Sequence, residues 1–353
     1  MGRRIAIVGA GAVGGYTGAH MVRAGEDVTF IDPWPEHVEH IRKHGLRVTH
    51  AMEVPEFTVE ARALHLTDVQ QLAKEKPIDI AFVCLKSYDT AWATMLISQY
   101  LAPDGYIVSL QNCMNEATVA SVVGWGKTLG CVASAITVNL SAPGHVHRGA
   151  GKGGARHTVY RTGEVHGRIT PRAEEVCRLV GHADSAMVTT NLWGERWSKL
   201  VANVMQNGLS ACTGLPGRAV LANDALRRFS ARLGSEAIRV GQAHGYKLEE
   251  ILHLDPEIIA RAGEGDEAAM RVHDEQRFKD AKHTAEGQRP SMGQDMVKGR
   301  RTEIEFLNGL VVREGEKVGI ACRANAALTD IVKRVERGEI APDPRHIVDL
   351  RLN

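Results

Sequence analysis

Three polar side chains recur at four-residue intervals within an apolar stretch in the second half of the chain. They are Lys199, Asn203 and Asn207. The apolar residues around them are Leu200, Val201, Val204, Met205 and Leu209. Residues four apart lie on one face of a helix, so the sequence predicts a narrow polar stripe. An ammonium group and two amides suit an oxygen-rich small substrate, and a buried structural network is the alternative.

Two further residues in this half could act with the stripe. Ser291 begins Ser291-Met292-Gly293-Gln294, which fits a capping box and predicts that Ser291 first serves to cap a helix over about 292–315. Glu303 offers a carboxylate, which beside a lysine could hold a substrate hydroxyl and orient a proton transfer. From spacing alone, a solvated or salt-bridged acid is the commoner role for such a glutamate.

The start of the chain carries a second chemical signal. An apolar strand over 4–8 is followed by Gly9-Ala10-Gly11-Ala12-Val13-Gly14 and a small-residue helix to about residue 22. A second strand over 27–31 then ends at Asp32. A glycine motif between a strand and a helix, with an acid at the tip of the next strand, predicts a dinucleotide site. The alternative is a structural glycine turn in an unrelated α/β protein.

Each position of this motif has a physical task. Gly9 permits the tight turn, Gly11 lets a pyrophosphate approach the backbone, and Gly14 allows the helix to pack closely on the sheet. The N–H groups at the helix start, where Ala12 and Val13 lie, would face the phosphates.

Asp32 indicates which nucleotide is preferred. A carboxylate here accepts hydrogen bonds from the ribose hydroxyls and repels a 2′-phosphate, which favours NAD over NADP. Asp32 could instead cap the helix that starts near Pro33. Arg42 and Lys43 could accept a phosphate if the loop folds back, and Trp34 could stack on adenine or cover the sheet edge.

Two polar residues follow strands of the same half. Lys86 follows a strand over 80–84, and Asn112 follows one over 106–110. Ligands of doubly wound sheets bind outside the carboxyl ends of the strands, so both side chains could reach a cofactor or substrate.

The order of elements predicts an α/β protein with two domains. Residues 1–190 form a Rossmann domain with a doubly wound sheet, and residues 191–353 form an all-helical substrate and catalytic domain. Further strands are predicted at 131–138 and 157–161, and loops at 103–105 and 141–144. The predicted helices cover 192–212, 224–244 and 292–315. The charged stretch 255–289 suits a lid, although a solvated pair of surface helices is the simpler interpretation.

Composition limits the function classes. The chain has 353 residues and a formal charge of +1, which gives no support for nucleic-acid or membrane binding. Its six cysteines form no Cys-X-X-Cys pair, so we expect buried thiols in a reducing cytoplasm. His37, His40 and His44 recur at helical spacing on a helix that should be solvated, and they lack a supporting Cys or acid. We therefore expect no metal site.

The whole chain resembles the ketopantoate reductase (2-dehydropantoate 2-reductase) family. The resemblance rests on segments that occur in the family's order: Gly9 to Gly14, Leu85-Lys86-Ser87, Leu110-Gln111-Asn112, Trp197-Ser198-Lys199-Leu200 with Asn203 and Asn207, Ser291 to Asp295, and Thr302-Glu303-Ile304.

The resemblance implies hydride transfer from C4 of a reduced nicotinamide to the carbonyl of a 2-keto acid, with the substrate in the cleft between the domains. It implies that Lys199 is the general acid and that Glu303 holds the hydroxyl and steadies Lys199. The implied substrate contacts are Asn203, Asn207 and Ser291, and the implied cofactor contacts include Lys86 and Asn112.

The chain departs from the family pattern in three places. Asp32 stands where members that use NADPH commonly carry a basic residue, and Gly217 stands where some members carry a substrate-binding Asn. The stretch 255–289 is longer than in compact members. These departures suggest an NADH-dependent relative with a 2-keto acid other than ketopantoate.

Two alternatives to that function stay open at this point. One is a non-catalytic NAD(H)-binding sensor on the same scaffold, and the other is a dehydrogenase that oxidises a different 2-hydroxy acid. A homodimer formed through the helical domain is a further expectation.

Overall fold

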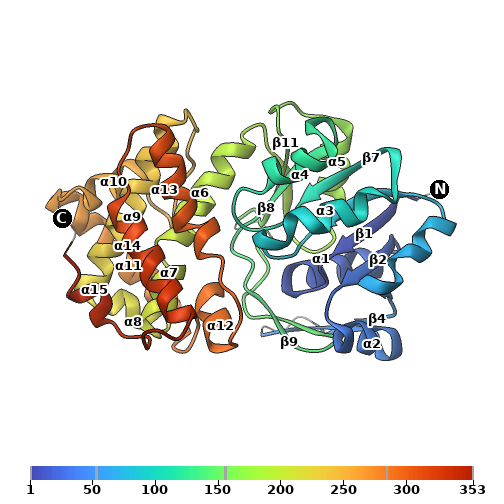
Figure 1. The fold of residues 1–353 in the computed structure, drawn as a ribbon, viewed down its shortest axis with the longest axis horizontal. Coiled ribbons are helices and arrows are strands. Elements are labelled where there is room, and N and C mark those ends of the chain that lie inside the picture. Colours follow the sequence, from blue (N-terminus) through green and yellow to red (C-terminus); the bar gives the residue numbers. More distant parts are fainter. Residues whose placement is uncertain (1, 52–54, 155–156, 284, 352–353) are drawn as a thin grey trace. The chain divides into compact units, whose positions relative to one another are not determined.

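The chain forms two compact units, Met1–Leu192 and Trp193–Asn353 (Figure 1). The computed structural model describes residues 2–51, 55–154, 157–283 and 285–351. The first unit is built on β-sheets and the second is helical. This confirms the predicted α/β class with an N-terminal Rossmann sheet and a helical C-terminal region. None of the described helices is long and apolar enough to cross a membrane.

The strands of the first unit form two sheets. The larger has the order β12-β11-β8-β7-β6-β1-β2-β5, and the smaller has the order β4-β3-β10-β9. The bounds are β1 Arg4–Val8, β2 Asp27–Asp32, β3 Leu46–His50, β4 Phe57–Val59, β5 Arg62–His65, β6 Ile78–Val83, β7 Leu101–Ser109, β8 Thr128–Ala133, β9 Val138–Ala142, β10 His145–Arg148, β11 Tyr160–Glu164 and β12 Ala186–Val188.

The larger sheet has a topological switch point at β1. Strands β5, β2, β1, β6, β7 and β8 run parallel, and β11 pairs antiparallel with β8. The chain leaves β1 for β2 on one side and later returns to β6 on the other side. Ligands of doubly wound sheets bind outside the carboxyl end of such a strand, which is where Gly9 begins.

Both faces of the larger sheet are covered. Ile5 and Ile7 of β1 lie in the apolar layer shared with helices α1, α2 and α5. Ala6 and Val8 lie in the layer shared with the 3-10 helix η1 and helices α3 and α4. All four residues are fully buried, which explains the continuous apolar strands. The helix bounds are α1 Ala12–Arg23, α2 Pro35–His44, η1 Leu66–Lys74, η2 Ser87–Asp89, α3 Thr90–Ser98, α4 Glu116–Val123, η3 Trp125–Lys127 and α5 Pro171–Gly181.

The smaller sheet was not predicted. Its strands are short, and β10 alternates half-buried histidines with the buried Val146, a pattern that also fits a surface strand. The loop predicted over 103–105 is wrong, because these residues lie within β7. The pairing of β7 with β6 is irregular between Ile78 and Ile80 of β6.

The second unit is helical, as predicted, but two of the expected long helices are each divided into shorter ones. The bounds are α6 Leu192–Val204, α7 Asn207–Thr213, α8 Gly217–Ala222, α9 Asp224–Ala243, α10 Pro256–Gly263, α11 Glu267–His283, α12 Ser291–Val297, η4 Ile304–Phe306, α13 Asn308–Lys317, α14 Arg323–Glu336 and α15 Arg345–Val348. The single helices predicted over 192–212 and 292–315 are therefore wrong.

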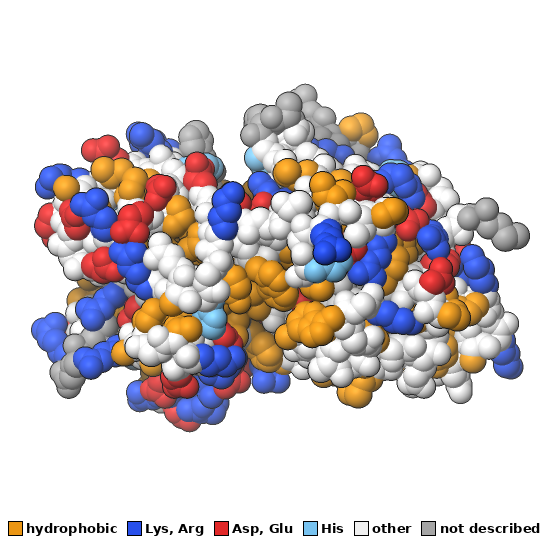
Figure 2. All heavy atoms as spheres, turned by 90° about the horizontal axis from the view of Figure 1, so that it is seen from above, with side chains coloured by type: hydrophobic (Ala, Val, Ile, Leu, Met, Phe, Trp, Pro, Cys, Tyr) orange, Lys and Arg blue, Asp and Glu red, His pale blue; other side chains and the backbone are white. Residues whose placement is uncertain are grey.

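The charged stretch 255–289 forms α10 and α11 in its described part. These helices are not simply solvated, because His273 and Arg277 of α11 are buried. Ala262 and Met270 join Ala231 of α9 in a small apolar cluster. Figure 2 shows acidic and basic side chains interspersed over the helical unit on the face that it displays.

His20 on α1 sits in an aromatic environment. Its ring meets Tyr16 edge-on at 4.7 Å and Phe57 at 4.9 Å between centroids, and the residue is 6% exposed. Burial lowers the pKa of His20 to about 3, and the positive charge of Lys152 contributes. His20 is therefore neutral in the folded protein over the working pH range.

We expect this histidine to make the fold acid-sensitive. In the unfolded chain, His20 takes up a proton near its ordinary pKa of about 6.5, whereas the folded chain resists protonation. Its stabilising effect is thus complete above about pH 6.5 and declines as the pH falls towards 3. Between pH 6.5 and 4.5, the wild type should lose roughly 2–3 kcal/mol more unfolding free energy than His20→Gln, measured by urea denaturation. Parallel pH profiles for the two proteins would contradict this.

Cys113 follows the end of β7 with an unusual backbone conformation. Its φ is +67° and the residue is 5% exposed. Left-handed backbone costs a residue with a Cβ energy that glycine avoids. The loop that carries Asn112 is therefore held in a strained turn by its surroundings.

The Ala and Gly variants of Cys113 should test this conformation. Both lose the thiol, so their difference reports the Cβ alone. At an ordinary position alanine is the more stable of the two, but here Cys113→Gly should exceed Cys113→Ala by about 1 kcal/mol in unfolding free energy. Chemical denaturation of both variants measures the difference, and greater stability of Cys113→Ala would exclude the left-handed backbone.

Candidate active site

The glycine loop has the geometry that a dinucleotide site needs. Gly9 has a φ of +101°, and a Cβ there would lie 2.9 Å from the backbone nitrogen of Leu85. A Cβ on Gly14 would lie 2.8 Å from Cys84 Cβ, so only glycine lets α1 approach the sheet this closely. Around Gly11 a Cβ would meet nothing within 4 Å, which leaves open space beside the backbone.

The start of α1 suits an anion. Gly11 is the N-cap and has no side chain to cap the helix, and the first turn, which includes Ala12 and Val13, carries no acid. Uncapped N–H groups and the helix dipole favour negative charge at this end. The loop therefore has the uncapped N–H groups that an anion needs, and its binding of a pyrophosphate stays a prediction from the motif.

Asp32 is held against this loop. Its Oδ2 accepts a hydrogen bond from the Ala10 backbone N–H at 2.8 Å, and its Oδ1 accepts one from Trp34 N–H at 2.9 Å. Burial raises the pKa of Asp32, while these two N–H groups stabilise the carboxylate. The alternative role as a helix cap is wrong, because α2 starts at Pro35 with Trp34 as its N-cap.

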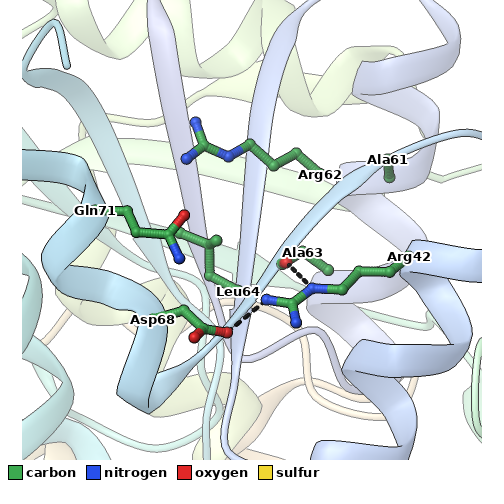
Figure 3. A pocket seen from close by; sticks show the side chains of 7 residues that line it. All are labelled: Arg42, Ala61, Arg62, Ala63, Leu64, Asp68 and Gln71. Atoms are coloured by element: carbon green, nitrogen blue, oxygen red, sulfur yellow. Dashed lines mark hydrogen bonds and ion pairs between the residues drawn. The ribbon is translucent and has the colours of Figure 1, made fainter. Parts of the chain in front are cut away.

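Arg42, the candidate for binding a phosphate, is engaged elsewhere. It lies at a hollow of about 450 Å³ beside β5. Its guanidinium group donates to Ala63 O at 2.8 Å and to Asp68 at 2.5 Å, and both interactions are drawn in Figure 3. A third bond joins it to Glu39 at 2.7 Å. Apart from Arg42, none of the predicted site residues lines this hollow, whose lining is Arg42, Ala61, Arg62, Ala63, Leu64, Asp68 and Gln71.

The loops that carry Lys86 and Asn112 are bonded to each other. The buried Gln111 side chain donates to Leu85 O at 2.9 Å and to Thr90 Oγ1 at 2.8 Å. Asn115 Nδ2 donates to Ser87 Oγ at 3.2 Å and to Asn112 O at 2.7 Å. The carboxyl ends of β6 and β7 thus form one unit that holds both predicted residues at this edge of the sheet.

The polar stripe of the helical unit lies on two helices rather than one. Lys199 and Asn203 are half-buried on α6, which ends at Val204, and Asn207 begins α7. The expectation that all three lie on one helix face is therefore wrong.

Two buried side chains hold the break between α6 and α7. In a continuous helix, Val204 O would accept from the amide of residue 208. Here Asn308 Nδ2 donates to Val204 O at 3.3 Å, and Ser230 Oγ donates to Met205 O at 2.7 Å. Without these donors, the carbonyl groups would be buried and unpaired, which is costly.

The break brings Asn207 to Ser291. Asn207 Nδ2 lies 3.4 Å from Ser291 Oγ, across a separation of 84 residues. The capping-box prediction is wrong, since Pro290 is the N-cap of α12 and no side chain caps that helix. The Ser291 hydroxyl is directed at the amide of Asn207 instead.

Glu303 lies directly before η4 in the helical unit. It is 5% exposed and precedes η4, whose Ile304 packs on α7 at Gly208. Thr302 beside it is buried and donates to Glu336 at 2.6 Å. Of the roles weighed for Glu303 from spacing, the solvated acid is wrong because the residue is buried, and burial tests neither the salt-bridged nor the catalytic role.

Gly217 leaves room near Ser291. Its N–H donates to Gln288 O at 3.0 Å and it begins α8. A Cβ at this position would make ordinary contacts of 3.7 Å with Gln288 O and 3.9 Å with Pro290. A Cβ would therefore be accommodated in ordinary van der Waals contact with its neighbours.

Sequence reasoning missed the residues that position the site. They are Gln111, Asn115, Ser230 and Asn308. Only Asn308 stands as a polar residue among apolar neighbours, and Gln111 appeared only within a segment of the family resemblance. Among the described residues, no group of three or more His, Cys, Asp or Glu side chains could hold a metal ion.

Models of known families match both units. The model of ketopantoate reductase PanE/ApbA matches residues 5–156, and that of ketopantoate reductase PanE/ApbA C terminal matches residues 191–336. The chain is 32% identical to 2-dehydropantoate 2-reductase of Archaeoglobus fulgidus, over 95% of this chain and 99% of the relative. It is 26% identical to that of Pyrococcus abyssi, over 94% and 98%.

Solved structures agree with this assignment. A PanE/ApbA family ketopantoate reductase from Ralstonia eutropha JMP134 matches with a TM-score of 0.76 and 28% identity, over 95% of this chain and 99% of that one. D-mandelate dehydrogenase shares the fold, with a TM-score of 0.79, 22% identity and coverage of 95% and 99%. The chain belongs to the ketopantoate reductase family.

Proposed function

We propose that this chain reduces the carbonyl of a 2-keto acid, such as 2-dehydropantoate, to the 2-hydroxy acid with NADH. The observation that carries the proposal is the break after α6, which brings Asn207 to Ser291. Membership of the family makes the chain a 2-keto acid reductase, and the choice of cofactor and substrate is what the proposal adds.

The proposed chemistry divides between the two units. The glycine loop would hold the pyrophosphate of a reduced nicotinamide cofactor, which would supply the hydride. Lys199 donates a proton to the oxygen of the reduced carbonyl, and Glu303 holds that hydroxyl and keeps Lys199 in place. The substrate carboxylate and hydroxyl are oriented by Asn203, Asn207 and Ser291, while Lys86 and Asn112 contact the cofactor.

The preference for NADH is supported by two side chains. Asp32 places a carboxylate beside the glycine loop, where ribose hydroxyls can bind and a 2′-phosphate is repelled. Arg42 is already bonded to three oxygens and is not available to offset that repulsion. The fold is compatible with this cofactor, since D-mandelate dehydrogenase was solved with NADH.

Gly217 offers no side chain to the substrate where some family members carry an Asn, so the substrates tested include acyl groups other than that of 2-dehydropantoate. Oxidation of NADH and of NADPH, followed by absorbance over a panel of branched and aromatic 2-keto acids, tests both parts of the proposal. Turnover of 2-keto acids with NADH is expected. Inactivity on the whole panel, and on 2-hydroxy acids with NAD, would contradict the proposal and favour a non-catalytic sensor.

The proposal includes two statements about the setting. The first is a location in a reducing cytoplasm. It is supported by the six cysteines of the chain, which form no disulfide with one another. A homodimer formed through the helical unit is proposed as well, and sedimentation measures it directly.

Replacement of the proton donor should lower the rate but not nucleotide binding. For Lys199→Ala we expect kcat to fall about 10²- to 10⁴-fold, the usual contribution of a positioned acid. The dissociation constant for NADH should stay within about twofold. Lys317→Ala is the matched control, because Lys317 is exposed and pairs only with Glu314 in a surface ion pair among the described contacts. Equal kcat in Lys199→Ala and wild type would rule out the assigned role.

Removal of the Asp32 carboxylate should loosen the cofactor preference. In Asp32→Ala, the kcat/KM for NADH should fall as the Ala10 N–H loses its acceptor, and repulsion of the 2′-phosphate should vanish. The NADH to NADPH ratio of kcat/KM should drop about tenfold or more. Asp27→Ala, at the exposed start of the same strand, should leave it unchanged. An unchanged NADH to NADPH ratio in Asp32→Ala would show that Asp32 does not determine the cofactor preference.

A further inference from the structure

We propose that His37 is a positioning residue whose hydrogen bond to Ala10 O fixes the glycine loop and thereby sets the affinity for the nucleotide, while the turn between β9 and β10 orients its ring. The inference rests on the proposed function, since it assumes that a nucleoside diphosphate binds at this loop. His37 was expected on a solvated helix face, but the structure shows it fully buried.

Both ring nitrogens of His37 are bonded to backbone groups. The Gly144 N–H donates to Nδ1 at 2.9 Å, and Nε2 lies 2.9 Å from Ala10 O. An amide nitrogen can only donate, so Nδ1 accepts and the ring proton is on Nε2, which donates to Ala10 O. The two partners therefore select one tautomer of a neutral ring.

The result is that Ala10 is held on both sides. Its N–H donates to Asp32 and its carbonyl accepts from His37. Ala10 lies between Gly9 and Gly11, directly before the N–H groups that would face the phosphates. Fixing both peptide groups of Ala10 orients those N–H groups before the ligand arrives, which lowers the entropic cost of binding.

The other end of the connection is anchored as well. Gly144 has a φ of +66°, and its carbonyl accepts from Arg47 N–H of β3 at 2.8 Å. Strand β10 ends at Arg148, which is fully buried and pairs with Asp184 at 2.5 Å. The ring of Trp34 stacks on His37 at 5.7 Å and 17°, which holds the imidazole plane.

Two amide variants separate the two bonds of His37. Glutamine can place its NH₂ where Nε2 lies and keep the donor to Ala10 O. Asparagine can place its carbonyl where Nδ1 lies and keep the acceptor for Gly144. We expect His37→Asn to raise the dissociation constant for NADH about tenfold and His37→Gln to stay within about threefold of wild type.

The measurement is titration of NADH fluorescence, with steady-state kinetics alongside. At saturating NADH, kcat should stay within about twofold of wild type in both variants, so that the loss appears in KM for the cofactor. His44→Asn, at the exposed end of the same helix, should match the wild type. Equal weakening by both His37 variants, or none by His37→Asn, would overturn the inference.

Direct binding separates this inference from the proposed function. If the wild type binds neither NADH nor NADPH, the proposed function fails and the inference fails with it. If the wild type binds NADH and His37→Asn binds it equally well, only the inference fails. If His37→Asn does not fold, amide hydrogen exchange of His37→Gln tests the inference instead. The exchange rate at Gly144 should rise, while residues 9–15 should stay as protected as in the wild type. Faster exchange over 9–15 would overturn the inference.

Discussion

The hydrogen bond from the Ala10 amide to the Asp32 carboxylate is the constraint on which the nucleotide-binding half depends. It joins the tip of β2 to the loop after β1, at the switch point of the sheet. The left-handed Gly9 and the close approach of Gly14 fix the rest of the loop. A buried carboxylate needs such donors, so the acid that selects the nucleotide also shapes the loop that binds it.

The sequence predicted this half best because its signals are local. A strand, three glycines and an acid lie within about thirty residues, so the motif can be recognised without knowledge of what the glycines contact. The smaller sheet and the burial of His37 escaped prediction. Both depend on Gly144, more than a hundred residues away from the histidine it contacts.

The helical half was predicted in type but not in detail. No glycine or proline marks the break at residues 205 and 206, because the donors that permit it come from Ser230 and Asn308. Likewise, the pattern at Ser291 fits a capping box, yet the hydroxyl lies at Asn207. Local spacing found the polar residues of the candidate site, whereas distant side chains decide which of them meet.

The attachment of the smaller sheet to α1 and the glycine loop has a consequence for partial unfolding. Proteins open in cooperative segments of unequal stability, and this sheet is short-stranded and partly polar. If it opened first, the start of α1 would lose its packing on Val146 while the main sheet stayed intact. The chain would then cease to bind the dinucleotide at a temperature well below that at which most of its secondary structure melts. Bound nucleotide would raise the temperature of this opening by mass action.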